Sequence, residues 1–214
     1  MANTVDEFIV EQMPPEASAV FGENLDKAIA YANALVDDSD QLGLLGPREL
    51  PKLWSRHILN SAVVAELLHA GDDVGDVGSG AGLPGIPMAI ARPDANFVLI
   101  EPMERRANWL QKQVDELGLE NVEVLRARAE EVGRSGFDVV TARAVSALPK
   151  LLRMTVDLIR PGGRLIALKG ERAQAEIDES KPLAKKLKLA SFDIVFAGAD
   201  VVSEPTRVVV VRLI

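Results

Sequence analysis

A glycine-rich stretch at residues 73–85 is the feature that most constrains how this chain can fold. Its five glycines follow a short apolar run and precede an apolar segment at residues 86–91, an order that predicts a strand, a tight turn and a helix. Gly78, Gly80 and Gly82 allow the backbone to adopt positive φ angles and to approach a ligand closely, because no Cβ intervenes. A turn of this kind binds a nucleotide-like molecule at the carboxyl edge of a parallel sheet.

Two registers of this glycine pattern compete. Residues 80–85 match the G-x-G-x-x-G fingerprint of dinucleotide-binding proteins, whereas residues 76–82 resemble the acidic-x-G-x-G-x-G pattern of S-adenosylmethionine-dependent methyltransferases. In the dinucleotide motif the first glycine directly follows the strand. The strand is expected to end near Val77, so Gly78 would come first and the sixth residue would be Leu83 rather than glycine. The register therefore favours the methyltransferase pattern, and a glycine-rich surface turn without a ligand remains the alternative.

From residue 73 onward, strand-like and helix-like segments alternate. Strands are expected at residues 74–77, 97–100, 122–125, 138–141 and 164–168, and helices at residues 86–91, 104–117, near Glu130 and at 147–159. Such short connections predict a parallel sheet with right-handed crossovers. Two further strands, at residues 192–197 and 207–214, have no helix between them and should pair antiparallel. The predicted fold is α/β: a Rossmann-like, mostly parallel seven-stranded sheet with a C-terminal antiparallel hairpin, as in class I S-adenosylmethionine-dependent methyltransferases.

The N-terminal third differs from this pattern. Residues 1–14 are expected to form a loose tail, and Asn24 is expected to cap a helix that ends at residues 37–40. Its apolar face would comprise Leu25, Ile29, Ala32 and Val36. A loop and a helical segment at residues 53–68 should follow. We therefore expect a tail and short helical extension at residues 1–70 and a Rossmann-like methyltransferase domain at residues 71–214, folded as one compact unit.

Composition limits the classes of protein and of site. A chain of 214 residues with 48% apolar residues suits one α/β domain with a sizeable core. No apolar run approaches the roughly 20 residues that span a bilayer, and the acidic N-terminus does not resemble a signal peptide. We expect a cytoplasmic monomer that does not bind membranes. With no cysteine and two histidines, the chain offers little for a metal site or a nucleophilic catalyst.

The net charge of −8 is concentrated near the N-terminus. Residues 1–40 hold nine of the 32 acidic residues and one of the 24 basic residues, so the remainder of the chain contains 23 of each. Because the main domain is neutral overall, it can still present a basic face to RNA. The overall charge therefore neither supports nor excludes a nucleic-acid substrate.

Several residues fall where a parallel sheet would hold a nucleoside. Glu101 ends the second expected strand, 23 residues after Gly78, close to where an acidic residue binds ribose hydroxyls in nucleotide-binding folds. Asp76 is expected to order the turn or to contact the amino-acid end of the ligand. Ala129 and Glu130 follow the third strand, where an adenine ring would lie. A solvated carboxylate at position 101 and a plain helix start at position 130 are the alternatives.

Basic residues gather in two places. Arg143 and Lys169 follow the fourth and fifth expected strands, at the edge where the ligand should lie. Residues 48–57 combine Arg48, Arg56 and His57 with a tryptophan, a mixture that suits phosphate contacts and base stacking. The alternatives are ordinary surface positions for the arginines and an amphipathic helix that buries the tryptophan.

These motifs resemble the family of ribosomal RNA small subunit methyltransferase G. The likeness is carried by residues 56–61 (RHILNS), 76–87 (DVGSGAGLPGIP), 137–144 (FDVVTARA) and 167–170 (ALKG). The resemblance implies S-adenosylmethionine as the methyl donor, and N7 of the guanine conventionally numbered 527 in bacterial 16S ribosomal RNA of the small subunit as the acceptor. It also implies cofactor contacts at Gly78, Leu83, Ala129, Glu130 and Arg143, and positions near the RNA for Arg56, His57 and Lys169.

The implied chemistry suits the residues available. N7 of guanine has an in-plane lone pair and no proton, so its methylation needs no general acid or base, and the protein would act mainly by positioning the reactants. We therefore expect Arg143 to serve as an anchor for the cofactor or a phosphate. Alternative functions are a small-molecule methyltransferase, a nicotinamide-dependent oxidoreductase, which the glycine register disfavours, and a cofactor-binding regulator without catalysis.

Overall fold

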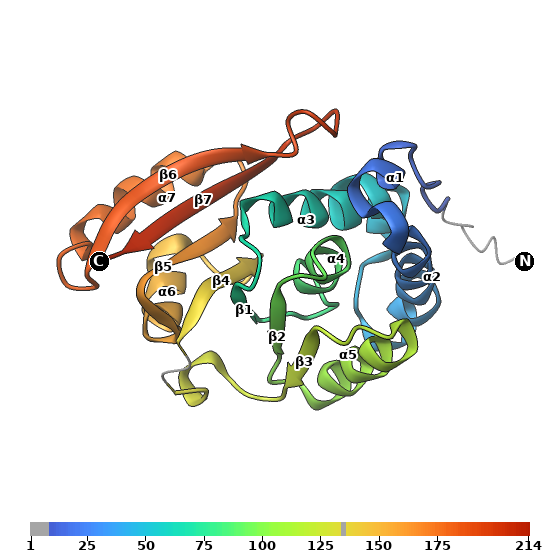
Figure 1. The fold of residues 1–214 in the computed structure, drawn as a ribbon, viewed down its shortest axis with the longest axis horizontal. Coiled ribbons are helices and arrows are strands. Elements are labelled where there is room, and N and C mark those ends of the chain that lie inside the picture. Colours follow the sequence, from blue (N-terminus) through green and yellow to red (C-terminus); the bar gives the residue numbers. More distant parts are fainter. Residues whose placement is uncertain (1–8, 134–135) are drawn as a thin grey trace, which may run out of the picture.

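The computed structural model describes residues 9–133 and 136–214, and a β-sheet forms its centre (Figure 1). Within these residues the sheet has seven strands in the order β3-β2-β1-β4-β5-β7-β6. They are β1 (Asp73–Val77), β2 (Asn96–Ile100), β3 (Val122–Leu125), β4 (Phe137–Arg143), β5 (Ile159–Leu168), β6 (Leu189–Ala197) and β7 (Thr206–Leu213). Neighbours among β1 to β5 pair parallel, whereas β7 pairs antiparallel with β5 and β6. The expected parallel sheet with an antiparallel hairpin is confirmed.

Parallel pairing brings the carboxyl ends of the central strands to one edge of the sheet. Val77 at the end of β1 pairs with Ile100 at the end of β2, and Arg143 at the end of β4 pairs with Leu168 at the end of β5. The residues that follow these strands in the sequence therefore lie along a common edge. Open α/β sheets bind their ligands at this edge.

Helices cover both faces of the sheet. α4 (Gly85–Ala91) and α5 (Glu104–Leu117) pack on one face, and α6 (Leu148–Thr155) and α7 (Ala173–Ser180) pack on the other. Neighbouring residues of one strand therefore enter different cores, since Val139 lies in the same cluster as Met88 of α4 while Val140 lies in the same cluster as Leu151 of α6. Burial on both faces agrees with the central strands β1 and β4, in which every residue but one is buried.

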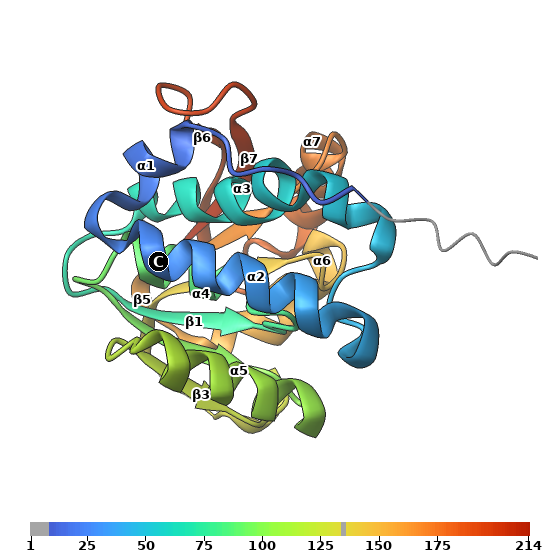
Figure 2. The ribbon, with the colours of Figure 1, turned by 90° about the vertical axis from the view of Figure 1, so that its right-hand side faces the viewer.

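The N-terminal helices add a layer outside α4 and α5 (Figure 2). α1 (Glu16–Phe21) and α2 (Leu25–Leu42) precede a helical segment at residues 47–67, which passes through 3₁₀, π, α (α3, Asn60–Ala62) and again 3₁₀ geometry. The Tyr31 hydroxyl of α2 donates a hydrogen bond to the carbonyl oxygen of Ala81 at 2.6 Å. The N-terminal layer is thus tied directly to the glycine-rich turn.

One prediction about α2 is wrong and another is only partly correct. The helix does not end at residues 37–40 but continues to Leu42, and Asp38 inside it accepts a hydrogen bond from Trp109 Nε1 at 2.8 Å. Asn24 occupies the expected N-cap position, but its side chain does not cap the helix, and its amide instead donates to the carbonyl oxygen of Ile90 at 3.2 Å. In both places the conformation depends on a contact with the Rossmann-like core. Such a contact cannot be predicted from the preferences of neighbouring residues.

The expected loose tail is also only partly correct. Residues 1–8 lie outside the described residues, and residues 9–14 contain no helix or strand. The Glu11 carboxylate nevertheless accepts hydrogen bonds from the backbone N–H groups of Trp54 at 2.8 Å and Ser55 at 3.0 Å. This carboxylate therefore satisfies two amides near the start of the π-helical stretch at Leu53–Leu59, where helices leave N–H groups unpaired.

Element boundaries after the glycine-rich turn are closer to expectation. α5 has the predicted bounds, and the short helix near Glu130 is a 3₁₀ turn at Ala129–Glu131. α6 ends at Thr155 and is followed by a 3₁₀ turn, so that β5 begins at residue 159 and is longer than predicted. None of the helices in the described ranges is both long and apolar enough to cross a membrane.

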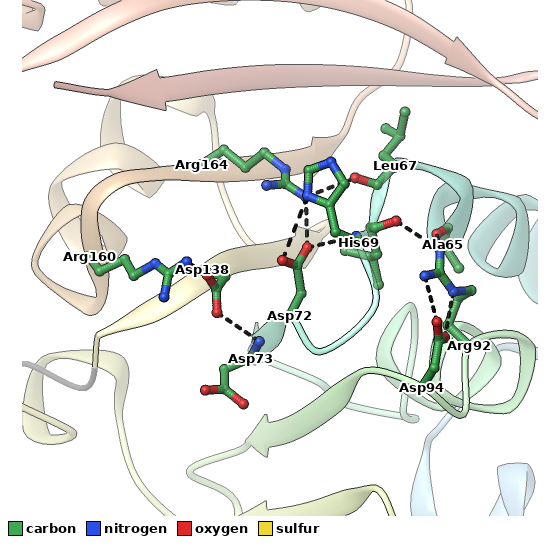
Figure 3. A network of polar contacts seen from close by, with 11 residues as sticks. Ala65, Leu67, His69, Asp72, Asp73, Arg92, Asp94, Asp138, Arg160 and Arg164 are labelled. Carbon is green, nitrogen blue, oxygen red and sulfur yellow. Dashed lines mark hydrogen bonds and ion pairs between the residues drawn. The ribbon is translucent and has the colours of Figure 1, made fainter.

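A network of charged residues holds the opposite, amino edge of the sheet (Figure 3). Arg164 Nη2 donates to Asp72 Oδ2 at 2.7 Å and to the carbonyl oxygen of Leu67 at 2.9 Å. Asp138 accepts a hydrogen bond from the backbone N–H of Asp73 at 3.0 Å. These side chains are engaged in joining strands to the preceding helical segment, so they are not candidates for the ligand site at the carboxyl edge.

Candidate active site

The glycine-rich turn has the backbone geometry that the sequence predicted. Gly78, Gly80 and Gly82 have φ angles of +71°, +58° and +85°, which only glycine adopts without strain. A Cβ on Gly82 would lie 2.5 Å from Ile86 Cδ1, and one on Gly85 would lie 2.4 Å from Leu99 Cδ2. The turn therefore packs closely on the start of α4 and on β2, and it exposes backbone rather than side chains to the carboxyl edge.

Asp76 lies beneath this turn and is fully buried. Its Oδ2 accepts a hydrogen bond from the backbone N–H of Gly85 at 3.2 Å, whereas Oδ1 has no hydrogen-bond partner within the described part of the chain. Burial raises the pKa of Asp76 to about 7. A buried carboxyl group with one unsatisfied oxygen is costly to the fold, and such groups are concentrated at functional sites.

Glu101 faces the glycine-rich turn from the end of β2. Its Oε2 accepts a hydrogen bond from the backbone N–H of Gly80 at 2.9 Å, and its Oε1 accepts one from Met103 N–H at 2.9 Å. The side chain is buried, at 3% exposure, so it is not the solvated strand-end residue of the alternative interpretation. Each oxygen retains capacity for a further donor.

The remaining predicted cofactor residues lie on and beside the same edge of the sheet. Leu83 is buried at the end of the turn, and the 3₁₀ turn at Ala129–Glu131 follows β3, next to β2 in the sheet. Within that turn Ala129 is buried and Glu130 is exposed. The residues predicted to contact a nucleoside therefore lie at the carboxyl ends of three adjacent strands, β1, β2 and β3.

Arg143 at the end of β4 reaches back to the helical segment at residues 53–61. Its Nη1 donates to the carbonyl oxygen of His57 at 3.2 Å and to Ser61 Oγ at 3.0 Å, and its Nη2 lies 2.8 Å from His57 Nδ1. A guanidinium only donates, so Nδ1 must be the acceptor and the ring proton must lie on Nε2. Nε2 is 2.8 Å from Glu49 Oε2, which completes a chain from Glu49 through His57 to Arg143.

The ionisation of His57 agrees with this assignment. Burial and the positive charge of Arg143 lower the pKa of His57 below its ordinary value, against the opposing effect of Glu49. The imidazole is therefore neutral at pH 7, with one nitrogen accepting and the other donating. Sequence reasoning selected Arg143 and His57 separately but missed Glu49 and Ser61. Ser61 contacts Arg143, 82 positions away in the sequence, and Glu49 reaches Arg143 only through His57.

A pocket of about 560 Å³ lies beyond Arg143, over the ends of β4 and β5. Its charged lining residues are Arg56, Arg143, Lys169, Glu176 and Arg207. Ala144, which also lines it, has a φ of +55°, a left-handed conformation that costs a non-glycine residue about 1–2 kcal/mol. Strain of this kind is found where backbone position matters to a site.

The residues expected near RNA differ in exposure. Arg48 is exposed, and the Arg56 side chain is 61% exposed. The His57 side chain is 8% exposed and that of Lys169 is 10% exposed, because each is held in a polar network. Arg48 and Arg56 are thus exposed to an external ligand, although Arg56 Nε lies 3.9 Å from Glu49 Oε2, while His57 and Lys169 line or support the pocket.

Comparison with known proteins gives a consistent result. The family model described as rRNA small subunit methyltransferase G matches residues 24–203. The protein of that name from Leifsonia xyli subsp. xyli is 53% identical over 201 residues, which is 94% of this chain and 96% of the relative. The one from Mycolicibacterium smegmatis is 48% identical over 209 residues, 95% of this chain and 88% of the relative.

Solved structures show the same architecture at low sequence identity. M. jannaschii TYW2 in complex with AdoMet superposes with a TM-score of 0.58 at 21% identity, covering 74% of this chain and 75% of that one. The tRNA (m1A58) methyltransferase TrmI from Aquifex aeolicus gives 0.55 at 15% identity, covering 72% and 68%. The expected class I methyltransferase fold is therefore confirmed.

Proposed function

Because the chain belongs to the family of rRNA small subunit methyltransferase G, we propose that it transfers a methyl group from S-adenosylmethionine to N7 of a guanine in 16S ribosomal RNA. The observation that carries this proposal is the match of nearly the whole chain to relatives of that name. The glycine-rich turn, with Glu101 and Asp76 against it, supplies a chemically suitable cofactor site on the same domain. We take the target to be guanine 527, as the resemblance of the motifs implies.

The fit of S-adenosylmethionine rests on the donor set at the turn. We propose that Glu101 accepts hydrogen bonds from the ribose hydroxyls and that Ala129 and Glu130 lie against the adenine. The cofactor would rest on the backbone of the glycine-rich turn, at Gly78, Gly80, Gly82 and Leu83. The Asp76 carboxyl group lies beneath the turn, and its Oδ1 has no hydrogen-bond partner in the described residues. In its ionised form it would attract the cationic amino-acid end of the ligand. When bound, the cofactor would supply an electrophilic methyl group, and the residues of the chain would bind the cofactor and the RNA and orient them for transfer.

The basic residues support a substrate that carries phosphates. Arg48 and Arg56 are exposed, and we propose that they contact the RNA backbone. His57 and Lys169 are proposed to act at shorter range, by shaping the pocket over β4 and β5. Such contacts should make binding strongly salt-dependent, because each neutralised phosphate releases counterions.

We also propose that residues 1–70 and 71–214 act as one folding unit and that the enzyme is a cytoplasmic monomer. The shared core of α1, α2, α4 and α5 supports the single unit. Bacterial ribosomal RNA, the proposed substrate, is made and assembled in the cytoplasm.

A methyl-transfer assay tests the proposed function. Small subunits from a strain that lacks this methyltransferase should accept one tritiated methyl group from S-adenosylmethionine, and chemical mapping should place it at N7 of guanine 527. Calorimetry should detect binding of S-adenosylmethionine and not of NAD. Failure to label ribosomal RNA would overturn the assignment of the substrate, and preferential binding of NAD would overturn the assignment of the cofactor.

Arg143→Ala should lower methyl-transfer turnover at least about tenfold while the fold persists, because it removes three hydrogen bonds from a charged group, each of which contributes about 1.5–3 kcal/mol. The change frees His57 and Ser61, and with them the helical segment that carries Arg56. Steady-state kinetics on small subunits and circular dichroism measure the two effects. The exposed Arg153→Ala on α6 is a matched control that should leave the kinetics unchanged. Wild-type kinetics for Arg143→Ala would refute its role.

A further inference from the structure

A partly buried ion pair lies at the far wall of the pocket over β4 and β5. Lys169, directly after β5, places its Nζ 2.8 Å from Oε2 of Glu176 in α7. The same ammonium donates to the carbonyl oxygen of Ser146 at 2.7 Å, and the same carboxylate oxygen accepts from Leu148 N–H at 2.7 Å. The two side chains are 10% and 16% exposed, and both line the pocket.

Each member of this pair keeps one unused hydrogen-bonding position. An ammonium has three N–H donors, and two of those of Lys169 are engaged. Oε1 of Glu176 has no hydrogen bond to any residue in the ranges 9–133 and 136–214. Burial raises the pKa of Glu176, but the hydrogen bonds from Lys169 and Leu148 outweigh it and hold the pKa below its ordinary value. The carboxylate is therefore ionised at neutral pH.

The pair lies close to the proposed methyl-transfer site. The loop between β4 and α6 contains Val145, which packs so tightly on the glycine-rich turn that a Cβ on Gly78 would lie 2.9 Å from its Cγ2. The next residue of that loop, Ser146, accepts the hydrogen bond from Lys169. A base placed over β4, between the turn and the pair, could therefore direct one edge to the cofactor and another to Lys169 and Glu176.

We infer that Lys169 and Glu176 together read the target base, with the Lys169 ammonium donating to O6 of guanine and Glu176 Oε1 accepting from N1–H. O6 and N1–H are adjacent on guanine, as an acceptor beside a donor, and the protein offers a donor beside an acceptor. Adenine presents an amino group and an unprotonated N1 at these positions, so both contacts would be mismatched. This assignment rests on the proposed function and names the groups that give that reaction its base specificity.

The assignment also suits the charge change at the base. N7 forms its bond to the methyl group with its own lone pair, the former carbon–sulfur pair stays on sulfur, and no proton moves. Positive charge therefore arrives on the purine ring. A carboxylate on N1–H opposes that charge, and because Glu176 offsets Lys169, the ammonium adds little net positive charge beside the ring.

Small subunits reconstituted with a single modified nucleoside at the target position test the inference. The wild-type enzyme should methylate guanosine and inosine at rates within a few-fold, because both carry O6 and N1–H. It should discriminate against 1-methylguanosine by about 10- to 100-fold, the range for loss of a good base contact. Glu176→Ala should methylate guanosine more slowly and should reduce that discrimination to a few-fold, because it lacks the acceptor and has room for the methyl group.

Three measurements keep the result interpretable. Glu179→Gln, on the same helix but 52% exposed, should retain wild-type discrimination. Calorimetry should give Glu176→Ala the wild-type affinity for S-adenosylmethionine, and if that variant does not fold, Glu176→Gln should show a 10- to 100-fold lower kcat/KM for guanosine. Wild-type discrimination in Glu176→Ala, or wild-type kcat/KM in Glu176→Gln, would overturn the inference alone. Absence of methylation by the wild-type enzyme would instead overturn the proposed function.

Discussion

Replacing Glu101 by alanine is expected to weaken S-adenosylmethionine binding about 100-fold, because hydrogen bonds to an ionised group contribute about 1.5–3 kcal/mol each and two ribose hydroxyls would lose their acceptor. The side chain is well placed for this role, since it is buried at the end of β2 and already accepts hydrogen bonds from Gly80 and Met103. Its removal would also free the Gly80 N–H and loosen the turn. Isothermal calorimetry with the purified enzyme measures the affinity.

Two further variants separate the ribose contact from other effects. Glu101→Asp retains the charge and should bind less than about tenfold more weakly, since one of the contacts can be re-formed. Glu104→Ala removes a carboxylate three residues away whose side chain is 64% exposed and pairs with Arg126, and it should bind like the wild type. A Glu101→Ala protein that melts normally and binds the cofactor as tightly as the wild type would show that this carboxylate does not hold the ribose.

The parts of the fold that sequence reasoning predicted correctly are those set by short-range pattern. Glycines at positions 78, 80 and 82 have positive φ as expected, and a Cβ would also meet close contacts at Gly78 and Gly82. The parallel pairing of β1 to β5 and the C-terminal hairpin followed from the alternation of strands and helices and from the missing helix before β7. The end of α2 was mispredicted because its polar residues contact α5, and a cluster of aspartates taken alone favours a helix end.

The site shows the same division between local and long-range information. Glu101 was found because its distance from the glycine-rich turn along the chain is characteristic of nucleotide-binding folds. Ser61 and Glu49 were missed because Arg143 contacts Ser61 directly, and Glu49 through His57, only after the chain has folded. Glu176 was missed for the same reason, since an acidic residue on a short polar helix has no distinguishing pattern until Lys169 and Leu148 are placed beside it.

Binding of S-adenosylmethionine is expected to strengthen as pH rises toward 7, by up to about tenfold per pH unit, because binding would displace a proton from Asp76. Burial raises the pKa of this carboxyl to about 7, so it is largely protonated at pH 6. A cationic sulfonium and ammonium bound over the turn would favour the ionised form and lower that pKa. Calorimetry at pH 6, 7 and 8 in buffers of different ionisation enthalpy measures both the affinity and the proton released.

The Asp76→Asn variant tests the same titration in the free protein. An unperturbed aspartate titrates near 3.9, so between about pH 4 and pH 7 the unfolded wild-type chain loses a proton that the folded chain keeps, and wild-type stability falls as pH rises. A pKa difference of about 3 units corresponds to about 4 kcal/mol, and asparagine does not titrate. The free energy of unfolding of Asp76→Asn should therefore rise relative to the wild type by about that amount from pH 4 to pH 8, while its cofactor affinity becomes weak and independent of pH. Urea unfolding gives the difference, and the exposed Asp157→Asn should show no such trend. If stability and cofactor affinity depended on pH in the same way in Asp76→Asn and in the wild type, Asp76 would be ionised throughout this pH range. Its carboxyl group would then not release a proton when the cationic cofactor binds.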